Sequence, residues 1–205
     1  MGLFGRVGKG EPYDWLVVGL GNPGEKYART RHNVGEEAVR LLAERRRVTL
    51  KGGRDTALVA EARLPGPDGD MRVVLAFPIT FMNDSGQAVS ALVRRYRIDT
   101  PEQIIVVQDE LDLAPGELKI KAGGGLAGHN GLRSITQHLK SQDYLRVRIG
   151  VGKPDHKDVG KGHVLSKVPK PERELLDIEI MNAADAVELI VARGVDAAMQ
   201  RYNGK

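Results

Sequence analysis

The sequence predicts an α/β fold: a single domain of three layers, in which helices cover both faces of a twisted, mixed and mostly parallel sheet. Short apolar runs, such as WLVVGL at 15–20 and IIVV at 104–107, have the length and composition of buried strands. Segments with apolar residues at helical spacing follow these runs. Strands that alternate with helices are typical of layered α/β proteins. With 205 residues, the chain is long enough to bury a substantial core within one domain.

The strands are expected where apolar residues gather between turn signals. The first run ends at GNPG, and the turn PGPDGD separates the second strand from the third. The segment YLRVRIGVG alternates in polarity, as a half-buried strand does. The expected strands span 15–20, 56–64, 71–77, 104–107, 117–121 and 144–152.

The helices are expected where apolar residues repeat on one face, and the C-terminal helix should be long. Asn33 with Glu36, and Asp84 with Gln87, resemble capping boxes at the starts of two helices. The four apolar faces comprise Val34, Ala38, Leu41 and Leu42; Ala88, Leu92 and Tyr96; Leu132, Ile135 and Leu139; and Leu176, Ile180, Ala184, Val187 and Val191.

The composition excludes several classes of protein and site. The chain has no cysteine, which excludes disulfides, thiolate catalysis and cysteine metal sites. No apolar run approaches the ~20 residues that a membrane span needs. Residues 1–14 lack the apolar core of a signal peptide, so we expect them to be a flexible extension and 15–205 to form the domain. We therefore expect a cytoplasmic monomer.

The charge is concentrated in one segment. The net charge is +4, which mildly favours polyanionic partners. The loop-like segment 153–170 holds five lysines against two aspartates, so +3 of that charge lies there. A solvated basic surface is the simpler interpretation of this segment, and contact with RNA is the alternative.

Polar residues follow the expected strands and begin the expected helices. Asn22 follows the first strand, Asn83 lies just past the third, and Asp109 follows IIVV. His32 and Asn130 lie at helix entrances. Because open α/β sheets bind ligands beyond the carboxyl ends of their strands, the sequence predicts a site that gathers these residues.

His32 has two interpretations. It could close a turn before its helix, or it could act as a general base. The partial positive charge of a helix N-terminus disfavours a protonated imidazole, so His32 is expected to be neutral near pH 7 and able to accept a proton. The second interpretation requires a polar partner that holds one tautomer.

The segment VVQDELDL offers such a partner. Asp109, Glu110 and Asp112 follow a buried strand. They could bind a divalent metal, form a solvated turn, or supply Asp109 as the acceptor for His32. The residues alone leave these three alternatives open.

The glycine-rich stretch AGGGLAGHNG matches neither a P-loop nor a dinucleotide-binding pattern. It could be a tight loop, or it could bring the backbone close to a ligand, with the amide of Asn130 at its end. No cysteine or G-x-S-x-G serine supplies a nucleophile. Hydrolysis would then use water activated by His32, which suits an activated ester better than an amide.

Four motifs, in order along the chain, resemble those of bacterial peptidyl-tRNA hydrolases: VVGLGNPGEKYARTRHNVG, PITFMNDSGQAV, DELDLAPGELKIKAGGGLAGHNGLRSI and RVRIGVGKP. The resemblance covers about residues 15–154 and continues more weakly to 195. It implies an esterase without metal or cofactor that cleaves the ester between a peptide, or another N-blocked aminoacyl group, and the terminal ribose of tRNA. The implied partner is the acceptor end of peptidyl-tRNA, with no membrane and no obligate protein partner.

The resemblance also assigns roles to single residues. It implies that His32 is the general base, that Asp109 stabilises its basic form, and that Asn22 helps to separate blocked from free aminoacyl-tRNA. Asn83 and Asn130 match residues that hold the substrate near the ester, and Asn130 is also placed to orient water.

The remaining matches concern tRNA. Tyr27 and Phe81 match positions that line the cleft for the tRNA end. Lys119, Lys121 and Arg148 occupy basic positions similar to those that contact the acceptor-stem phosphate.

The chain departs from the family pattern at Gln108, where the family often has histidine, and we expect tuning rather than loss of activity. The segment 153–170 is not closely similar to the family either. Two other functions compete with the esterase: an RNA-binding protein that has lost hydrolysis, and a metal-dependent phosphohydrolase that uses Asp109, Glu110 and Asp112. The enzyme is favoured over the binding protein because four of the implied site residues are all present: His32, Asp109, Asn22 and Asn130.

Overall fold

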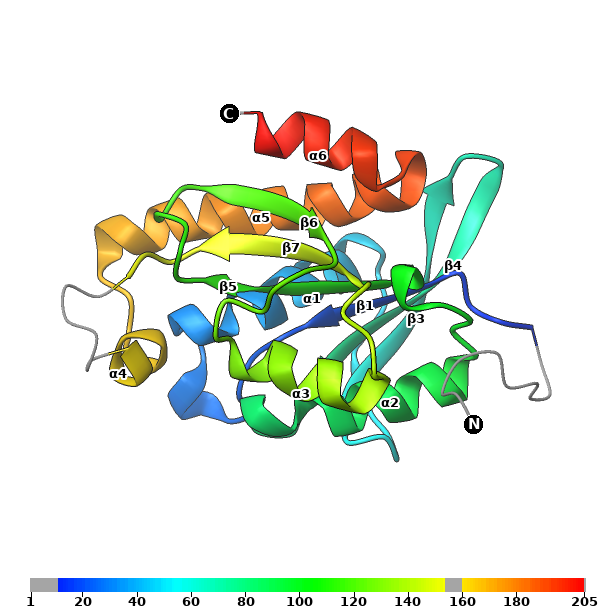
Figure 1. Cartoon of the computed structure of the whole chain (residues 1–205), viewed down its shortest axis with the longest axis horizontal. Helices are drawn as coiled ribbons and strands as arrows, with labels where there is room; N and C mark the ends of the chain where they lie inside the picture. The colour runs from blue at the N-terminus through cyan, green and yellow to red at the C-terminus, as the bar shows by residue number, and fades with distance from the viewer. Residues whose placement is uncertain (1–10, 154–159, 205) are drawn as a thin grey trace.

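The computed structural model describes residues 11–153 and 160–204, and a mixed sheet runs through their centre (Figure 1). Within these residues the sheet has seven strands in the order β2-β3-β4-β1-β5-β7-β6. The strands are β1 (Trp15–Gly19), β2 (Lys51–Gly52), β3 (Ala57–Gly66), β4 (Gly69–Pro78), β5 (Ile104–Glu110), β6 (Leu118–Ala122) and β7 (Leu145–Gly150).

The four central strands, β4, β1, β5 and β7, are parallel, whereas β3 and β6 run antiparallel to their neighbours. Every residue of β5 is buried, because helices cover this strand on both faces. Because β1 and β5 are parallel neighbours, their carboxyl ends open beside each other at the same edge of the sheet.

Two helical layers enclose the sheet. Helices α1 (Val34–Arg45), α5 (Lys170–Arg193) and α6 (Val195–Asn203) pack on one face, and α2 (Ser85–Tyr96) and α3 (Asn130–Leu139) pack side by side on the other. The short helix α4 (Gly160–Leu165) precedes α5. The 3-10 turns are η1 (Glu25–Tyr27), η2 (Arg31–Asn33), η3 (Met82–Asp84) and η4 (Pro101–Gln103). Among the described residues, no helix is both long enough and apolar enough to cross a membrane.

The predicted α/β fold and its six strands are confirmed, and the structure adds the two-residue strand β2. Two of our local predictions are wrong. Asn33 and Asp84 occupy the N-cap positions of α1 and α2, yet neither side chain caps its helix. The segment 153–170 is not wholly a loop, because it contains α4; its residues 154–159 lie outside the described part.

The last two residues of the predicted N-terminal extension, Tyr13 and Asp14, contact the domain. The backbone N–H of Tyr13 donates to Tyr96 O at 3.1 Å, and that of Asp14 donates to Arg72 O at 2.9 Å. The ring of Tyr13 also packs edge-on against Tyr96. Residues 1–10 lie outside the described residues.

A close approach of two glycines sets the position of α1 against the sheet. A Cβ atom added to Gly35, in the first turn of α1, would overlap the carbonyl oxygen of Val107 in β5. A Cβ added to Gly19, at the end of β1, would overlap the carbonyl oxygen of Gly35. Only glycine at both positions lets α1 begin against the ends of β1 and β5. This contact brings the turn η2, which precedes α1, to the carboxyl edge of the sheet.

Candidate active site

A cleft of about 340 Å³ opens at this edge of the sheet. The chain reaches it from the turn after β1, from η2 and η3, from the end of β5, from the entrance of α3 and from α4. Seven residues that the sequence predicted for the site line it: Asn22, Tyr27, His32, Phe81, Asn83, Asp109 and Asn130.

His32 and Asp109 form a hydrogen bond in the wall of this cleft. His32 Nδ1 lies 2.8 Å from Asp109 Oδ1, although the two residues are 77 positions apart in the sequence. The Asp109 side chain is buried and that of His32 is 12% exposed. Since the carboxylate accepts, Nδ1 carries the proton and donates. The lone pair of His32 is then on Nε2, which has no protein hydrogen-bond partner within the described part of the chain.

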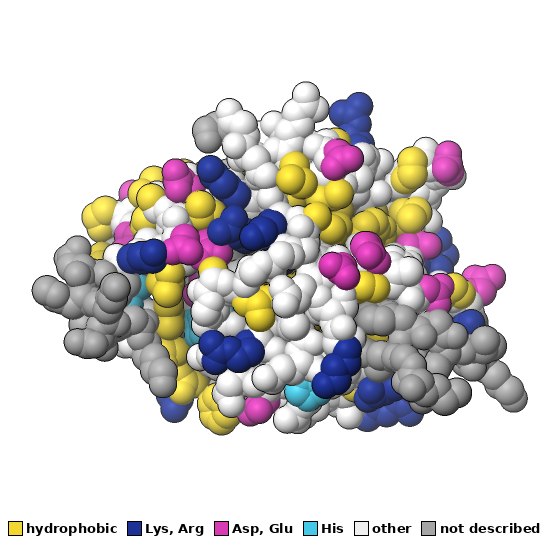
Figure 2. Space-filling view, viewed as in Figure 1, with side chains coloured by type: hydrophobic (Ala, Val, Ile, Leu, Met, Phe, Trp, Pro, Cys, Tyr) yellow, Lys and Arg dark blue, Asp and Glu magenta, His cyan; other side chains and the backbone are white. Residues whose placement is uncertain are grey.

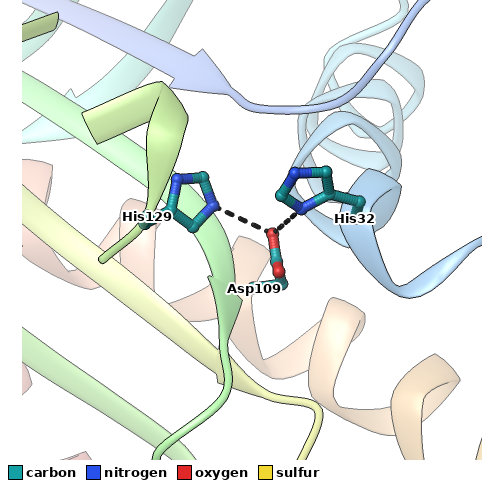
Figure 3. A group of neighbouring side chains, drawn as sticks. All are labelled: His32, Asp109 and His129. Atoms are coloured by element: carbon teal, nitrogen blue, oxygen red, sulfur yellow. Dashed lines mark hydrogen bonds and ion pairs between the residues drawn. The ribbon is translucent and has the colours of Figure 1, made fainter. Parts of the chain in front are cut away.

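A second histidine donates to the same carboxylate oxygen (Figure 3). His129 Nε2 lies 3.0 Å from Asp109 Oδ1. His129 is the N-cap of α3, and its Nδ1 accepts from the backbone N–H groups of Gly131 at 3.1 Å and Leu132 at 3.4 Å. Two donors to Nδ1 require that this nitrogen has no proton, so the proton of His129 is on Nε2. His129 is therefore a neutral donor whose tautomer is fixed by the start of α3.

The pKa values follow from these contacts. Burial lowers the pKa of the His32 imidazole, but the charge of Asp109 and the hydrogen bond to it raise that pKa by more, so the net pKa lies above its ordinary value. This direction is opposite to the one expected from the helix N-terminus alone. Burial raises the pKa of Asp109, and the two imidazoles lower it by more, so this carboxyl has a pKa far below its usual range and is ionised.

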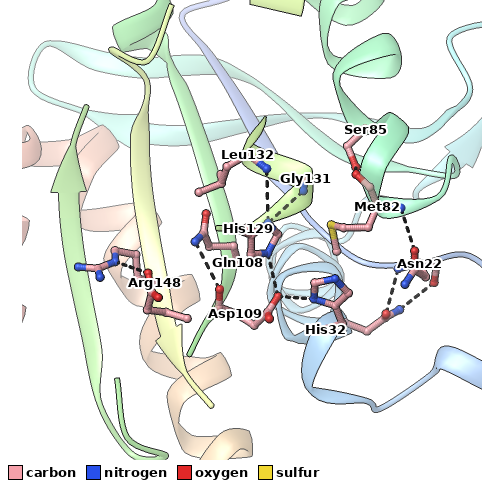
Figure 4. A network of polar contacts seen from close by, with 12 residues as sticks. Asn22, His32, Met82, Ser85, Gln108, Asp109, His129, Gly131, Leu132 and Arg148 are labelled. Atoms are coloured by element: carbon pink, nitrogen blue, oxygen red, sulfur yellow. Dashed lines mark hydrogen bonds and ion pairs between the residues drawn. The ribbon is translucent and has the colours of Figure 1, made fainter. Parts of the chain in front are cut away.

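Asn22 is held in place by hydrogen bonds on three sides (Figure 4). Its Oδ1 accepts from the backbone N–H of Met82 at 2.8 Å. The side chain of Asn33 spans the backbone of Asn22: Oδ1 accepts from Asn22 N, and Nδ2 donates to Asn22 O, both at 3.0 Å. These contacts leave the Nδ2 donors of Asn22 for a ligand in the cleft. Asn33 thus supports the site instead of capping α1.

The other predicted cleft residues are more exposed. Phe81 is 56% exposed although it is a large apolar side chain. Asn83 makes a weak contact with Asp84 at 3.4 Å, and Asn130 Oδ1 accepts from Arg133 at 3.3 Å. Exposed aromatic and amide groups around an open cleft are suited to contact a ligand that arrives from solvent.

The predicted phosphate contacts lie outside the cleft, on the strand pair β6–β7. In the antiparallel register of these two strands, Lys119 is opposite Arg148 and Lys121 is opposite Arg146. Cationic side chains gather over this part of the surface, next to acidic ones (Figure 2). Arg148 donates to Glu110 at 2.9 Å, so part of its charge is neutralised within the protein. Glu110 lines the cleft beside Asp109, so this ion pair links the basic strands to the site.

Comparisons with known proteins identify the family of this chain. Residues 16–205 match the family model described as peptidyl-tRNA hydrolase. This chain belongs to the peptidyl-tRNA hydrolase family. A peptidyl-tRNA hydrolase of Kineococcus radiotolerans is 46% identical over 92% of this chain and 96% of its own. One from Leifsonia xyli is 48% identical over 92% of this chain and 96% of its own. The crystal structure of peptidyl-tRNA hydrolase from Acinetobacter baumannii has a TM-score of 0.83 and 41% identity, with 95% of this chain and 97% of that chain covered.

The carboxylates that could have formed a metal site are each paired elsewhere. Glu110 binds Arg148, and Asp112 binds Lys153 Nζ at 2.5 Å. Among the described residues, His32, Asp109 and His129 do offer three ligand atoms within 4.8 Å of one another. Both nitrogens, however, approach one oxygen at hydrogen-bond distances, and the fixed tautomer of His129 directs an N–H at that oxygen. The arrangement matches two hydrogen-bond donors on a shared acceptor.

Two features of this family member were missed from the sequence. His129 was passed over in favour of its neighbour Asn130, although a histidine directly before a helix occupies a capping position that could have indicated a role. Val164 and Leu165 of α4 line the cleft from a segment expected to be a loop. Gln108, which the sequence already marked as a departure from the family pattern, is buried next to Asp109. Its Nε2 donates to Asp109 O at 3.3 Å, and its Oε1 has no partner among the described residues.

Proposed function

We propose that this chain hydrolyses the ester between a peptide, or another N-blocked aminoacyl group, and the terminal ribose of tRNA, and so returns tRNA to translation. Membership of the peptidyl-tRNA hydrolase family supports the substrate class. The observation that carries the mechanism is the hydrogen bond from His32 Nδ1 to the ionised Asp109, which leaves the Nε2 lone pair for the cleft.

In the proposed reaction, His32 Nε2 removes a proton from a water molecule as the water oxygen attacks the ester carbonyl carbon. The imidazolium that forms is stabilised by Asp109, whose negative charge is itself held by the N–H of His129. When the tetrahedral intermediate collapses, the bond to the ribose oxygen breaks and His32 returns its proton to that oxygen. The products are a free carboxylic acid and tRNA with an intact terminal hydroxyl.

The amides of the cleft are assigned to the substrate. Asn22 Nδ2 is the best-oriented donor, because Met82 holds the opposite atom of the same amide. We assign it to a carbonyl of the blocked aminoacyl group. Asn83 and Asn130 are assigned to the ester region, with Asn130 also orienting the attacking water, and Tyr27 and Phe81 to the terminal bases of tRNA. Donors directed at an oxygen that becomes negative favour the transition state over the ground state.

Lys119, Lys121 and Arg148 are assigned to an acceptor-stem phosphate. Each phosphate that a protein neutralises steepens the fall of affinity with salt concentration. Lys119→Ala and Lys121→Ala are the cleaner variants, because Arg148→Ala would also leave the buried Glu110 without its partner. We expect both lysine variants to bind all tRNAs more weakly and with a shallower salt dependence. An unchanged slope in both would refute a phosphate clamp at this strand pair.

We also expect the protein to act as a cytoplasmic monomer without cofactor or obligate protein partner. Sedimentation of the purified chain with and without tRNA tests the oligomeric state. A stable dimer in the absence of tRNA would contradict this expectation.

The central experiment measures release of N-blocked amino acid from tRNA by the wild type and by His32→Ala. We expect His32→Ala to lose turnover by about 10²–10⁴-fold, the usual contribution of a general base, while tRNA binding is retained. His138→Ala is the matched control, because His138 is an exposed histidine on α3 whose one hydrogen-bond partner in the described part of the chain is Ser134 O. Near-normal turnover in His32→Ala would show that another group is the base.

The same assay separates the esterase from its two rivals. Full activity in the presence of a chelator would exclude a phosphohydrolase that depends on metal. Tight tRNA binding without any release of the aminoacyl group would instead indicate a binding protein that has lost hydrolysis.

A further inference from the structure

Arg146, the second residue of β7, is a buried cation that has no carboxylate partner among the described residues. It is 2% exposed, and within the described residues its hydrogen-bond acceptors are all backbone carbonyls. Nη1 donates to Gly125 O at 2.7 Å, and Nη2 donates to Gly124 O at 2.5 Å and to Gly123 O. Burial of the guanidinium lowers the pKa of Arg146, which indicates that the site costs energy to maintain.

The three carbonyls belong to the start of the glycine-rich loop 123–128, just after β6 ends at Ala122. Gly123 and Gly124 have φ values of 61° and 81°, a left-handed conformation that favours glycine. This conformation turns successive carbonyls toward the same side chain, where the sheet no longer provides donors. One planar guanidinium can satisfy several acceptors in a fixed geometry, which a lysine ammonium cannot reproduce.

The loop 123–128 connects the basic strand pair β6–β7 with the cleft. Strand β6 lies at the beginning of the loop, and its Lys121 is opposite Arg146 of β7 in the antiparallel strand register. At its end are His129, which donates to Asp109, and Asn130, which lines the cleft. Lys121 also lies close to the loop, because a Cβ added to Gly124 would be 3.3 Å from Lys121 Nζ.

We propose that Arg146 is a positioning residue for hydrolysis: it holds the loop 123–128 in one conformation and so fixes His129 and Asn130 relative to Asp109 and to the basic face of β6–β7. This inference rests on the proposed function, because its effect on rate depends on the cleft being the site of hydrolysis. Arg146 acts through the loop and does not touch the substrate. A misplacement of about 1 Å at catalytic groups is enough to cost ~10²-fold in rate.

The test compares Arg146→Lys with wild type, and uses Arg63→Lys, on an exposed part of β3, as the matched control. We expect Arg146→Lys to lower kcat by about 10–100-fold. KM for N-blocked aminoacyl-tRNA, and the salt slope of tRNA binding, should stay close to wild type because Lys119 and Lys121 remain. A raised KM with a shallower salt slope would mean that Arg146 binds phosphate directly, and would overturn the proposal. So would a kcat within twofold of wild type.

A second substitution distinguishes positioning from general destabilisation. His129→Asn removes the donor to Asp109 but retains a side chain that can cap α3. If Arg146 acts through His129, adding Arg146→Lys to His129→Asn should lower kcat much less than Arg146→Lys does alone. Losses that multiply fully would overturn a route through His129 and leave the two residues independent.

Hydrogen exchange provides a readout that does not depend on activity. Amides of residues 123–130 should exchange faster in Arg146→Lys, whereas those of the distant strand β3 should not change. Unchanged exchange in the loop would overturn the positioning role even if the rate fell. If wild type releases no aminoacyl group but loop exchange responds as expected, the proposed function fails and the structural role of Arg146 stands.

Discussion

Replacing Asp109 by asparagine removes the charge that organises the site while leaving the shape of the side chain nearly unchanged. In the wild type, Asp109 Oδ1 accepts from His32 at 2.8 Å and from His129 at 3.0 Å. During the reaction His32 gains a positive charge, which the carboxylate stabilises. Two unit charges about 4 Å apart attract by about 4 kcal/mol at an effective dielectric constant near 20. Because each 1.36 kcal/mol is tenfold in rate, Asp109→Asn should lose kcat/KM by about 10³-fold.

The pH dependence gives the same variant a second readout. The Asp109 carboxylate is the group that raises the pKa of His32, and burial lowers it. His32 can act as a base only when unprotonated, so the wild-type kcat/KM should rise with pH through a midpoint above 6.5, the ordinary histidine value. In Asp109→Asn the effect of burial remains and the raising effect is lost, so the midpoint should move to lower pH.

The assay is release of N-blocked amino acid from tRNA, measured between about pH 5 and pH 9 around the ordinary histidine pKa. Asp112→Asn is the matched control, since Asp112 is exposed and pairs with Lys153 rather than with an imidazole. Loss of rate in Asp112→Asn equal to that in Asp109→Asn would refute the reasoning. So would an Asp109→Asn profile with its midpoint unchanged or at higher pH.

Three further predictions concern residues that support the site. His129→Asn should retain the melting temperature, because asparagine also caps helices. It should lower kcat and move the acidic midpoint of the pH–rate profile to higher pH. An unchanged profile would show that the hydrogen bond from His129 to Asp109 is irrelevant to the rate. Arg31→Met should reduce the free energy of unfolding, measured in urea, by about 3 kcal/mol, because it breaks an ion pair in which Arg31 is buried and Glu172 is partly buried. The double variant with Glu172→Gln should lose less stability than the two single variants added together. Losses of stability that add fully would show that Arg31 and Glu172 do not interact. Gly35→Ala should destabilise the protein by about 3 kcal/mol or prevent folding, because the added Cβ overlaps the sheet. Gly52→Ala is the control: its added Cβ would lie 3.8 Å from the nearest atom, so stability should change by under ~0.5 kcal/mol.

The sequence predicted the fold because its strands are strongly patterned. Runs such as IIVV are apolar on both faces, which is typical of a strand covered by helices on both sides, and β5 is buried throughout. Ligands bind beyond the carboxyl ends of strands, and from this rule the sequence predicts that His32 and Asp109 lie in one site. That rule works because parallel neighbours in register, such as β1 and β5, end at the same edge.

What the sequence could not predict depends on long-range contacts of single side chains. Asn33 has the type and position of a helix cap, yet its amide binds the backbone of Asn22, eleven positions earlier. Spacing within a helix cannot reveal a partner outside it. The tautomer of His129 likewise follows from two backbone N–H groups that exist only once α3 has formed. The segment around Val164 has too few apolar residues to display a helical period.

Arg31, next to the proposed base, also bears on the order in which the protein is completed. Its guanidinium binds Glu172 through two bonds of 2.6 and 2.5 Å, and 141 positions separate the two residues. While the nascent chain leaves the ribosome, β1 and its following turn are made early, yet the carboxylate that neutralises this arginine arrives only with α5. Until then the cation is left without its counter-charge one residue from His32. The cleft therefore reaches its final geometry only after α5 has been made.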